Sequence, residues 1–228
     1  MSGTLNIVTT PIGNYSDITV RALRILNESD YIICEEYKEA SKLLRFFDLK
    51  KDLVSVNEHN EKESSDEIFM DIVSGKNVSL ISDCGTPLFS DPGSLLVQKC
   101  IEAKIKIEFI GGSNSLLASI VLSGFDISRF YFIGFLSPKS DIRIIELEKL
   151  KHLDKVIALM DAPYRLKAVL NDIKKIFEER KIFVAFNITM NEEIKFRGSA
   201  GEILVEIGEN NLKGEFVIII DKYNIKSK

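Results

Sequence analysis

Short apolar segments rich in β-branched residues alternate along this chain with longer amphipathic segments, and this alternation limits the possible folds most. Eight segments have the length and composition of strands, and the last four are dense enough in Ile, Val and Phe to be buried on both faces, as in parallel sheets. They are Leu5–Thr9, Tyr31–Glu35, Val78–Ser82, Ile105–Ile110, Phe130–Phe135, Lys155–Met160, Ile182–Ile188 and Glu215–Ile220. The pattern predicts an α/β fold with much parallel sheet.

The segments between these strands have the periodicity of amphipathic helices. Two are clear in the first half of the chain: one follows Asp17, which we expect to be its N-cap, and one follows Glu36. Their apolar faces are Ile18, Ala22, Ile25 and Leu26 in the first helix and Ala40, Leu43, Leu44 and Phe47 in the second. Both faces are expected to pack on the sheet.

A loop-forming stretch in the middle of the chain, Gly111–Ser115, divides the strands into two series. A length of 228 residues suits two small domains. We therefore predict an N-terminal α/β domain over residues 1–111 and a C-terminal α/β domain over residues 112–228. Met190 and Asn191 lie between two strand-like runs, so the second sheet is expected to contain a hairpin and to be mixed.

The composition limits the partners and the location of the chain. Thirty Lys and Arg against 34 Asp and Glu give a net charge of −4, so a polyanion must meet a local basic patch. The three cysteines form no CxxC pair, and no window reaches the roughly 18 apolar residues of a membrane span. The first residues lack the basic and apolar regions of a secretory leader. The sequence predicts a cytoplasmic chain with no membrane partner.

Several common enzyme motifs are missing from the sequence. It has no GxGxxG after the first strand, no GxxxxGK[ST], no GxSxG and no HExxH. These absences argue against a standard dinucleotide site, a P-loop, a serine-hydrolase elbow and a zinc peptidase. His59 and His152 are the only histidines, so a histidine-rich metal site is excluded and we predict no metal ligands.

Two loops that follow strands are the best candidates for a ligand site, because open α/β sheets bind ligands at the carboxyl ends of their strands. The first is Thr9–Asn14, and the second, Ser82–Gly93, contains two Asp, two Pro and two Gly directly after a buried strand. We expect Asp83, at the end of that strand, to contact the ligand. Asp91 is expected to be the N-cap of the next helix, with Pro92 at its first position.

Eight short motifs, in this order and spacing, resemble those of one known enzyme family. They are TTPIGNYSDITVRAL, the pair Glu35-Glu36, SVNEHNE, SDCGTPLFSDPG, FIGFL, APYR, FRG and KGEF. This sequence resembles the ribosomal RNA small subunit methyltransferase I family, a branch of the tetrapyrrole methylase superfamily. The resemblance covers nearly the whole chain, and SDxGTPLxSDPG together with TPIGN is its most specific part.

The resemblance implies two α/β/α domains of tetrapyrrole methylase type with S-adenosylmethionine in the cleft between them, and a homodimer. It also implies 2′-O-methylation of a cytidine ribose in small-subunit ribosomal RNA. The implied cofactor-binding residues are Pro11, Gly13, Asp83, Gly85, Thr86, Pro87, Leu88, Asn114, Ser115, Met160, Ala162 and Asn187. The implied substrate-side residues are Asn14, Glu35, His59, Asn60, Arg165 and Arg197.

Methyl transfer from a sulfonium needs alignment of the reacting atoms more than it needs reactive side chains. A ribose hydroxyl is a poor nucleophile, however, and benefits from a carboxylate that accepts its proton. Glu35, at the end of the second strand, is our candidate for this catalytic base. The equally weighted alternative is that Glu35 only caps the following helix or neutralises Lys38.

The candidate substrate residues also have structural alternatives. His59 lies in a polar loop, which suits either an RNA contact or an ordinary surface turn. Arg165 and Arg197 are the best candidates for contacts with phosphate, but each suits a structural ion pair as well, and for Arg197 this second interpretation is the stronger.

The chain differs from the family pattern mainly in polar groups. The family usually has Glu-Asp-Thr-Arg where this chain has Glu35–Lys38, and Pro-Gly-Pro-Ser-Ala where it has Gly111–Ser115. Asp161–Arg165 and Phe186–Met190 lose a His, an Arg, a Glu and a Lys of the pattern. Two alternatives to ribosomal RNA methylation therefore stay open: a diverged paralogue that methylates a tetrapyrrole or another small molecule, and a non-catalytic protein that kept the cofactor-binding fold.

Overall fold

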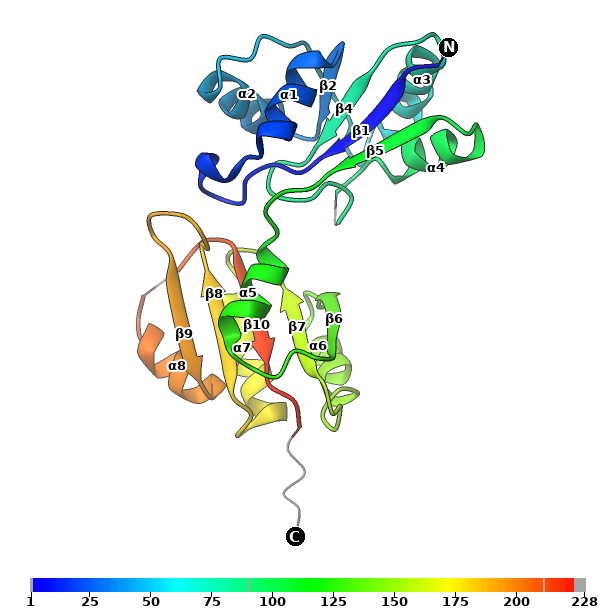
Figure 1. Cartoon of the computed structure of the whole chain (residues 1–228). Helices are drawn as coiled ribbons and strands as arrows, with labels where there is room; N and C mark the ends of the chain where they lie inside the picture. Colours follow the sequence, from blue (N-terminus) through cyan, green and yellow to red (C-terminus); the bar gives the residue numbers. More distant parts are fainter. Residues whose placement is uncertain (1, 90, 211, 224–228) are drawn as a thin grey trace. The chain divides into compact units, whose positions relative to one another are not determined.

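The chain divides into two compact units, residues 1–114 and 115–228 (Figure 1). The computed structural model describes residues 2–89, 91–210 and 212–223. The division falls close to the expected domain boundary between residues 111 and 112. Each unit has its own sheet and its own apolar core.

The N-terminal unit is built on a five-stranded sheet with the order β3-β2-β4-β1-β5, in which every pair of neighbours is parallel. Its strands are β1 (Thr4–Val8), β2 (Tyr31–Cys34), β3 (Leu53–Ser55), β4 (Val78–Ile81) and β5 (Lys106–Ile110). Four of them confirm strands expected from the sequence. β3 was not expected, because it has only three residues and all are half-buried.

Helices cover both faces of this sheet, so the unit has α/β/α layers. They are α1 (Val20–Glu28), α2 (Tyr37–Phe46), α3 (Glu61–Val73) and α4 (Ser94–Glu102), with a short 3-10 turn, η1 (Tyr15–Asp17), before α1. Leu26 and Leu43 pack on the side of the sheet that carries Ile32, while Ile68 and Leu96 pack on the other side. The apolar periodicity in the sequence placed α1 and α2 correctly.

The expected N-cap of α1 is wrong. Thr19 has this position, and its side-chain oxygen accepts a hydrogen bond from the backbone N–H of Ala22 at 3.1 Å. Asp17 lies two residues earlier in η1, whose own cap is Asn14. The local pattern of polar residues thus predicted a helix start but missed the extra turn that precedes it.

The C-terminal unit has a mixed sheet with the order β6-β7-β10-β8-β9. Its strands are β6 (Phe130–Phe135), β7 (Val156–Met160), β8 (Ile182–Phe186), β9 (Ile194–Gly198) and β10 (Phe216–Ile220). β6 is parallel to β7, whereas β10 is antiparallel to both β7 and β8. β8 and β9 form the antiparallel hairpin expected around Met190, and the mixed character of this sheet is confirmed.

Helices also cover both faces of the second sheet. They are α5 (Ser115–Ser123), α6 (Ser140–Glu148), α7 (Leu166–Phe177) and α8 (Ala200–Ile207). Leu147, Val169 and Ile203, from α6, α7 and α8, pack in one core with the sheet, and α5 packs against β8 and β10 (Figure 1). Among the described helices of the chain, none is both long enough and apolar enough to cross a membrane.

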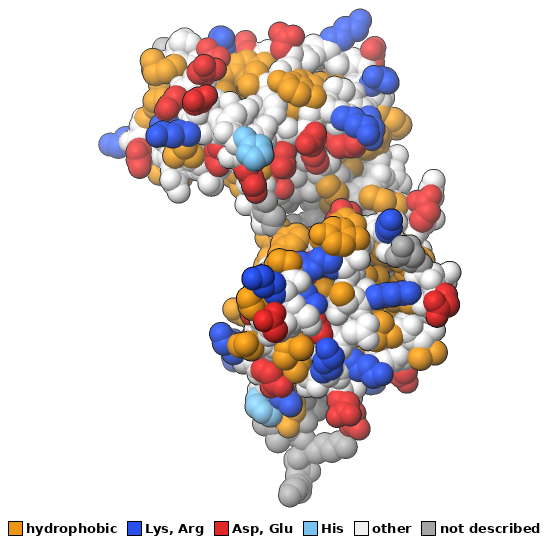
Figure 2. Space-filling model, turned by 180° about the vertical axis from the view of Figure 1, so that it is seen from behind, with side chains coloured by type: hydrophobic (Ala, Val, Ile, Leu, Met, Phe, Trp, Pro, Cys, Tyr) orange, Lys and Arg blue, Asp and Glu red, His pale blue; other side chains and the backbone are white. Residues whose placement is uncertain are grey.

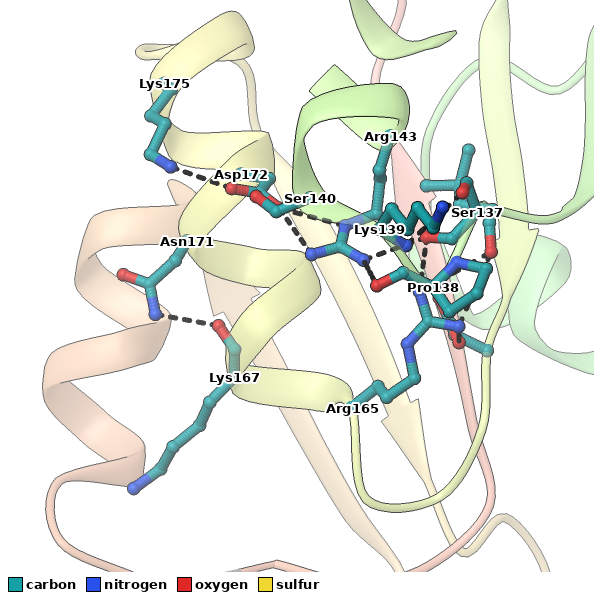
Figure 3. A network of polar contacts seen from close by, with 12 residues as sticks. Ser137, Pro138, Lys139, Ser140, Arg143, Arg165, Lys167, Asn171, Asp172 and Lys175 are labelled. Carbon is teal, nitrogen blue, oxygen red and sulfur yellow. Dashed lines mark hydrogen bonds and ion pairs between the residues drawn. The ribbon is translucent and has the colours of Figure 1, made fainter. Parts of the chain in front are cut away.

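A buried ion pair joins α6 to α7. Arg143 Nε donates to Asp172 Oδ2 at 2.9 Å, and both side chains are 3% exposed. The same carboxylate accepts from Ser140 Oγ and Lys175 Nζ, each at 2.8 Å (Figure 3). Arg143 Nη1 also donates to the carbonyl of Ser137 at 2.9 Å. The pair therefore fixes the loop between β6 and α6 as well as the two helices.

Candidate functional site

The loops that follow β1 and β4 are joined through one threonine. Thr10 Oγ1 lies 3.0 Å from the carbonyl of Ser82, to which it donates, and accepts from the backbone N–H of Gly85 at 3.1 Å. The backbone N–H of Thr10 donates to the carbonyl of Gly85 at 2.9 Å. β1 and β4 are parallel neighbours, so their carboxyl ends lie at one edge of the sheet. The two sequence motifs thus form a single platform at that edge.

The carboxylate of Asp83 connects this platform to the end of β2. Its Oδ1 accepts from the backbone N–H of Glu36 at 3.3 Å, and its side chain is exposed. The pKa of Asp83 is raised, mainly because the carboxylate loses hydration, and the charges of Glu36, Glu39 and Asp91 raise it further. The hydrogen bond from the backbone of Glu36 lowers the pKa but does not outweigh these effects. Asp83 therefore presents an acceptor at the strand end.

Glu35 lies directly after β2 in the same acidic neighbourhood. It is half-buried, and the pKa of its carboxyl is raised first by lost hydration and then by the charges of Asp91, Asp83, Glu36 and Glu58. Within the described part of the chain, no ion pair joins Glu35 to Lys38. A carboxylate with a raised pKa is a better proton acceptor near neutral pH.

The polar segment before α3 is held by its own asparagines. Asn60 Oδ1 accepts from the backbone N–H of Asn57 at 2.8 Å, and Asn60 Nδ2 donates to the carbonyl of Ser55 at 3.0 Å. Asn57 Oδ1 accepts from the backbone N–H of His59. The side chain of Asn60 is thus used to shape the loop, whereas the imidazole of His59 is exposed.

The expected capping role of Asp91 is wrong, and a residue outside the candidate set takes it. α4 begins at Ser94 with Gly93 as N-cap, at a φ of 115°. Glu61 Oε1 accepts from the backbone N–H groups of Gly93 at 2.8 Å and Leu95 at 3.2 Å. Glu61 therefore fastens the start of α3 to the end of the loop after β4. Its place at the end of the SVNEHNE motif is the only sequence signal that could have drawn attention to it.

Among the described non-glycine residues, three of the five with left-handed backbone lie in the loops after β4 and β8. Leu88 has a φ of 68°, and Asn187 and Thr189 have φ values of 49° and 67°. Such conformations cost energy in non-glycine residues and occur often at functional sites. These residues follow β4 and β8, in the segments where the family resemblance implies cofactor contacts.

The remaining loop at the edge of the first sheet follows β5. Asn114 Nδ2 lies 3.5 Å from Thr86 Oγ1, so this loop contacts the platform, and Ser115 begins α5. Gly112 packs on Thr9, where an added Cβ would lie 3.1 Å from the threonine side chain. The loops at this edge carry ten of the candidates from the N-terminal half, namely Pro11, Gly13, Asn14, Glu35, Asp83, Gly85, Thr86, Pro87, Leu88 and Asn114. The other two, His59 and Asn60, lie in the loop after β3.

The second sheet carries its candidates at the carboxyl ends of β7 and β8. Met160 ends β7, and Asn187 follows β8, whose direction matches that of β7 because β10 is antiparallel to both. An added Cβ on Gly214 would lie 2.2 Å from Asn187 Oδ1, so only glycine permits this close approach. Asp161 Oδ1 accepts from the backbone N–H of Ala162 at 2.7 Å.

Arg165 is occupied by protein acceptors. It forms an ion pair with Asp161 at 2.8 Å, and its Nη2 donates to the carbonyl of Ser137 at 2.6 Å (Figure 3). The side chain is 13% exposed. This geometry matches the structural alternative that the sequence left open, and a contact with phosphate stays a prediction.

Arg197 is also occupied by contacts within the C-terminal unit. Its guanidinium donates to the carbonyls of Leu122 and Ser123 at the end of α5 and lies 4.4 Å from the ring centroid of Phe183. A cation at a helix C-terminus interacts favourably with the helix dipole. Arg197 thus anchors α5 to β9, which favours its structural interpretation.

The donor and acceptor set at these edges suits S-adenosylmethionine. The cofactor offers ammonium, ribose hydroxyl and adenine amino donors, and Asp83 and the loop carbonyls are matching acceptors. The glycine at position 85, with a φ of 85°, lets backbone approach a ligand closely. Among the described residues, no group of three His, Cys, Asp or Glu side chains is arranged to hold a metal ion. The expected cleft between the two units stays a prediction.

Comparison with known proteins decides the family. The family model described as Tetrapyrrole (Corrin/Porphyrin) Methylases matches residues 4–204. Ribosomal RNA small subunit methyltransferase I of Thermotoga maritima is 38% identical over 218 residues, which cover 96% of this chain and 98% of that protein. The chain belongs to the ribosomal RNA small subunit methyltransferase I family. Its Synechocystis relative of the same name is 38% identical over 96% of this chain and 78% of its own length.

Solved structures agree with the fold expected for a member of the methyltransferase I family. Diphthine synthase has a TM-score of 0.78 at 17% identity, covering 96% of this chain and 90% of that chain. Uroporphyrin-III-C-methyltransferase of Thermus thermophilus has a TM-score of 0.66 at 17% identity, covering 96% and 94%. The predicted family and the tetrapyrrole methylase type of α/β fold are confirmed.

Proposed function

We propose that this protein transfers a methyl group from S-adenosylmethionine to the 2′-oxygen of a ribose in small-subunit ribosomal RNA. The chain is an S-adenosylmethionine-dependent methyltransferase by its family. The observation that carries the RNA target is the 38% identity with the Thermotoga maritima enzyme over nearly the full length of both chains. Structural likeness to the uroporphyrin enzyme concerns the fold alone, so nothing specific favours a tetrapyrrole substrate.

The joined loops of the N-terminal unit are our proposed cofactor platform. Asp83 accepts hydrogen bonds from the cofactor, and the backbone from Gly85 to Leu88, with Pro11 and Gly13, forms the surface beneath it. The other proposed cofactor-binding residues are Asn114, Ser115, Met160, Ala162 and Asn187. The support is the hydrogen-bonded link between Thr10 and Gly85, which holds the two motifs in one arrangement before a ligand arrives.

The bound cofactor supplies an electrophilic methyl group on a sulfonium. A ribose hydroxyl that attacks this methyl group would have to lose its proton, and we propose that Glu35 takes that proton on its carboxylate. Its partial burial and acidic neighbours support this role, because both raise its pKa. Asn14, His59 and Asn60 remain the proposed contacts to RNA. Arg165 and Arg197 are the remaining candidates, but their contacts with protein groups support the structural alternative for both.

A homodimer that acts in the cytoplasm completes the proposal. Large apolar side chains are exposed on α5, which packs against β8 and β10, and on the edge strand β6. They are Leu117, Val121 and Leu122 on α5 and Phe130, Tyr131 and Phe135 on β6. Exposed apolar patches of this kind mark interaction surfaces, so we assign this one to a second copy of the chain.

The direct test is transfer of radiolabelled methyl from S-adenosylmethionine to isolated small ribosomal subunits. We expect incorporation into the RNA, and resistance of one linkage to alkaline hydrolysis, because a 2′-O-methyl group removes the nucleophile for strand cleavage. Porphyrinoid substrates serve as the comparison. Labelling of a porphyrinoid and none of the ribosomal subunits would overturn the proposal.

A further inference from the structure

The C-terminal unit has a hollow at the sheet edge opposite Met160 and Asn187. It lies where β8 begins and β10 ends, and its volume is about 690 Å³. We call it the basic groove, lined by Lys151, Lys175, Ile176, Phe177, Glu178, Glu179, Arg180, Lys181, Asp221, Lys222 and Tyr223. Strands of five residues, at about 3.3 Å each, separate it by roughly 16 Å from the loops proposed for the cofactor.

Positive charge predominates in the basic groove. Five of its residues are Lys or Arg and three are Asp or Glu. In the part of the chain that the structure describes, no ion pair or hydrogen bond engages the ammonium groups of Lys151 and Lys181, which leaves both able to meet an anion. Asp172, which pairs with Lys175, is already neutralised by the buried Arg143. Lys175 therefore contributes surplus charge to the groove.

The two units differ in charge in a way that favours the C-terminal one as the site for a polyanion. Residues 1–114 contain 18 Asp and Glu against 12 Lys and Arg, whereas residues 115–228 contain 16 against 18. Figure 2 shows acidic side chains gathered on the visible face of the N-terminal unit and many Lys and Arg side chains on that of the C-terminal unit. A polyanion is attracted to the second unit and repelled by the first.

Arg180, in the wall of the groove, has an unfilled donor. Its Nε donates to the carbonyl of Asp221 at 2.6 Å and its Nη2 to that of Lys155 at 3.3 Å. Its Nη1 is buried and, among the described residues, has no partner. Burial lowers the pKa of Arg180 to about 10, against the charges of Asp221 and Asp154. A buried guanidinium N–H without an acceptor is unusual. The positive charge of Arg180 therefore lies in the wall of the groove without a carboxylate of any described residue bonded to it, and it adds to the attraction for an anion.

An aromatic side chain adjoins these cations. Tyr223 lines the groove, is 37% exposed, and meets the ring of His152 edge-on at 5.4 Å between centroids. Proteins that bind single-stranded RNA combine basic grooves along the backbone with aromatic rings on which bases stack. The basic groove contains both elements.

We propose that the basic groove binds the phosphodiester backbone of the RNA substrate, away from the methylated ribose. Lys151 and Lys181 contact phosphates, the charge of Arg180 adds to the attraction, and Tyr223 stacks on a base. The inference rests on the proposed function, since it supplies an RNA that extends beyond the reacting nucleotide. It adds a contact surface that is separate from the cofactor loops.

The test compares RNA affinity between two matched double variants of the full chain. Lys151→Ala with Lys181→Ala removes two groove cations, and Lys50→Ala with Lys174→Ala removes two exposed lysines outside it. The probe is a fluorescein-labelled single-stranded RNA of mixed sequence, followed by anisotropy over a range of salt. We expect the groove variant to bind about tenfold more weakly and its salt slope to fall by about 1.4, at roughly 0.7 per lost phosphate contact. The control is expected to match the wild type.

Equal affinities and slopes for the two variants would overturn the proposal. Calorimetry with inorganic phosphate is the second arm: phosphate binding that the groove substitutions abolish, with RNA affinity unchanged, would also overturn it by making the groove a site for free phosphate. Cofactor binding by the groove variant should equal that of the wild type. Failure of the proposed function appears instead as a wild-type protein that binds no S-adenosylmethionine and methylates no ribosomal RNA.

Discussion

Glu61 accepts hydrogen bonds from the backbone N–H groups of Gly93 and Leu95 through one oxygen. This contact links two segments. One is the SVNEHNE segment, which carries proposed RNA contacts, and the other is the loop after β4, which carries proposed cofactor contacts. It also caps α4, whose N-cap glycine has no side chain of its own to do so. Two motifs that are about 30 residues apart in the sequence are therefore held in one arrangement.

Glu61→Ala should weaken S-adenosylmethionine binding by about tenfold, equivalent to ~1.4 kcal/mol, because the end of the loop after β4 loses its anchor. Glu61→Gln keeps an oxygen acceptor and should recover most of the affinity. Calorimetry measures both. Glu67→Ala, which removes an exposed carboxylate from the same helix, is the control. Wild-type affinity in Glu61→Ala would show that the contact does not position the loop.

Glu35→Gln should lower kcat by about 10²- to 10³-fold, within the usual range for loss of a general base, and should leave cofactor affinity unchanged. The pKa of Glu35 is raised above its ordinary 4.5, and the base acts only when deprotonated. The rate of the wild type should therefore fall as the pH drops through this raised pKa, and the variant should lack that acid limb. The measurement is a pH–rate profile of single-turnover methylation for the wild type and for Glu35→Gln. An identical fall in rate at low pH in both proteins would show that a group other than Glu35 titrates.

The buried pair of Arg143 and Asp172 should control the stability of the C-terminal unit (Figure 3). Arg143→Met leaves a buried carboxylate without its main partner and should cost about 3–5 kcal/mol of unfolding free energy. The double variant Arg143→Met with Asp172→Leu removes both charges and should recover much of this loss. Urea denaturation measures the three proteins. A double variant as unstable as Arg143→Met would show that the loss of unfolding free energy comes from lost packing and not from the unpaired charge.

The same pair should make stability depend on pH in one direction. Burial acts to raise the pKa of Asp172, but hydrogen bonds from Lys175, Ser140 and Arg143 and the charge of Arg143 outweigh it, so the pKa is lowered. Because the pKa of Asp172 is lower in the folded state, its ionised carboxylate stabilises the protein at pH values above the unfolded-state pKa of about 3.9. This stabilisation is lost as the pH falls from there through the folded-state pKa. Urea denaturation at pH 5 and at pH 3 should therefore show a larger loss of unfolding free energy for the wild type than for Arg143→Met.

The proposed dimer surface is tested by charge on α5. Val121 is 68% exposed, and Val121→Glu should convert the dimer into a monomer in sedimentation velocity, because a charge in a standard interface of about 1,600 Å² is costly. Val205→Glu places the same change on α8, where Val205 is 81% exposed. This control should sediment as the wild type. A monomeric wild type, or a dimer that tolerates Val121→Glu, would contradict the assignment.

The apolar runs were enough to predict most of the fold. Strands such as Tyr31–Cys34 and Ile182–Phe186 are buried throughout, so their composition marks them. β3 escaped because three half-buried residues at the sheet edge carry no such pattern. The hairpin at β8 and β9 followed from local turn composition. Elements that bury apolar surface were therefore visible in the sequence.

The contacts of the polar residues were much less predictable. Asp91 satisfies the local rule for an N-cap, yet Glu61 performs the capping from a distant part of the chain. Arg165 and Arg197 were recognised as cations near the site, but each also donates to a carbonyl, of Ser137 or Ser123, that only the folded unit brings close. A sequence shows which groups are present, whereas their partners depend on how loops fold in three dimensions.

The most direct test of the central claim is calorimetry of S-adenosylmethionine and S-adenosylhomocysteine binding to the wild type, Asp83→Ala and the control Asp52→Ala, which alters an exposed aspartate elsewhere in the same unit. If the loops after β1 and β4 hold the cofactor, the wild type and the control bind equally and Asp83→Ala binds at least about tenfold more weakly, since a hydrogen bond to a charged group contributes about 1.5–3 kcal/mol. Absence of any binding by the wild type, or wild-type affinity in Asp83→Ala, would contradict the claim.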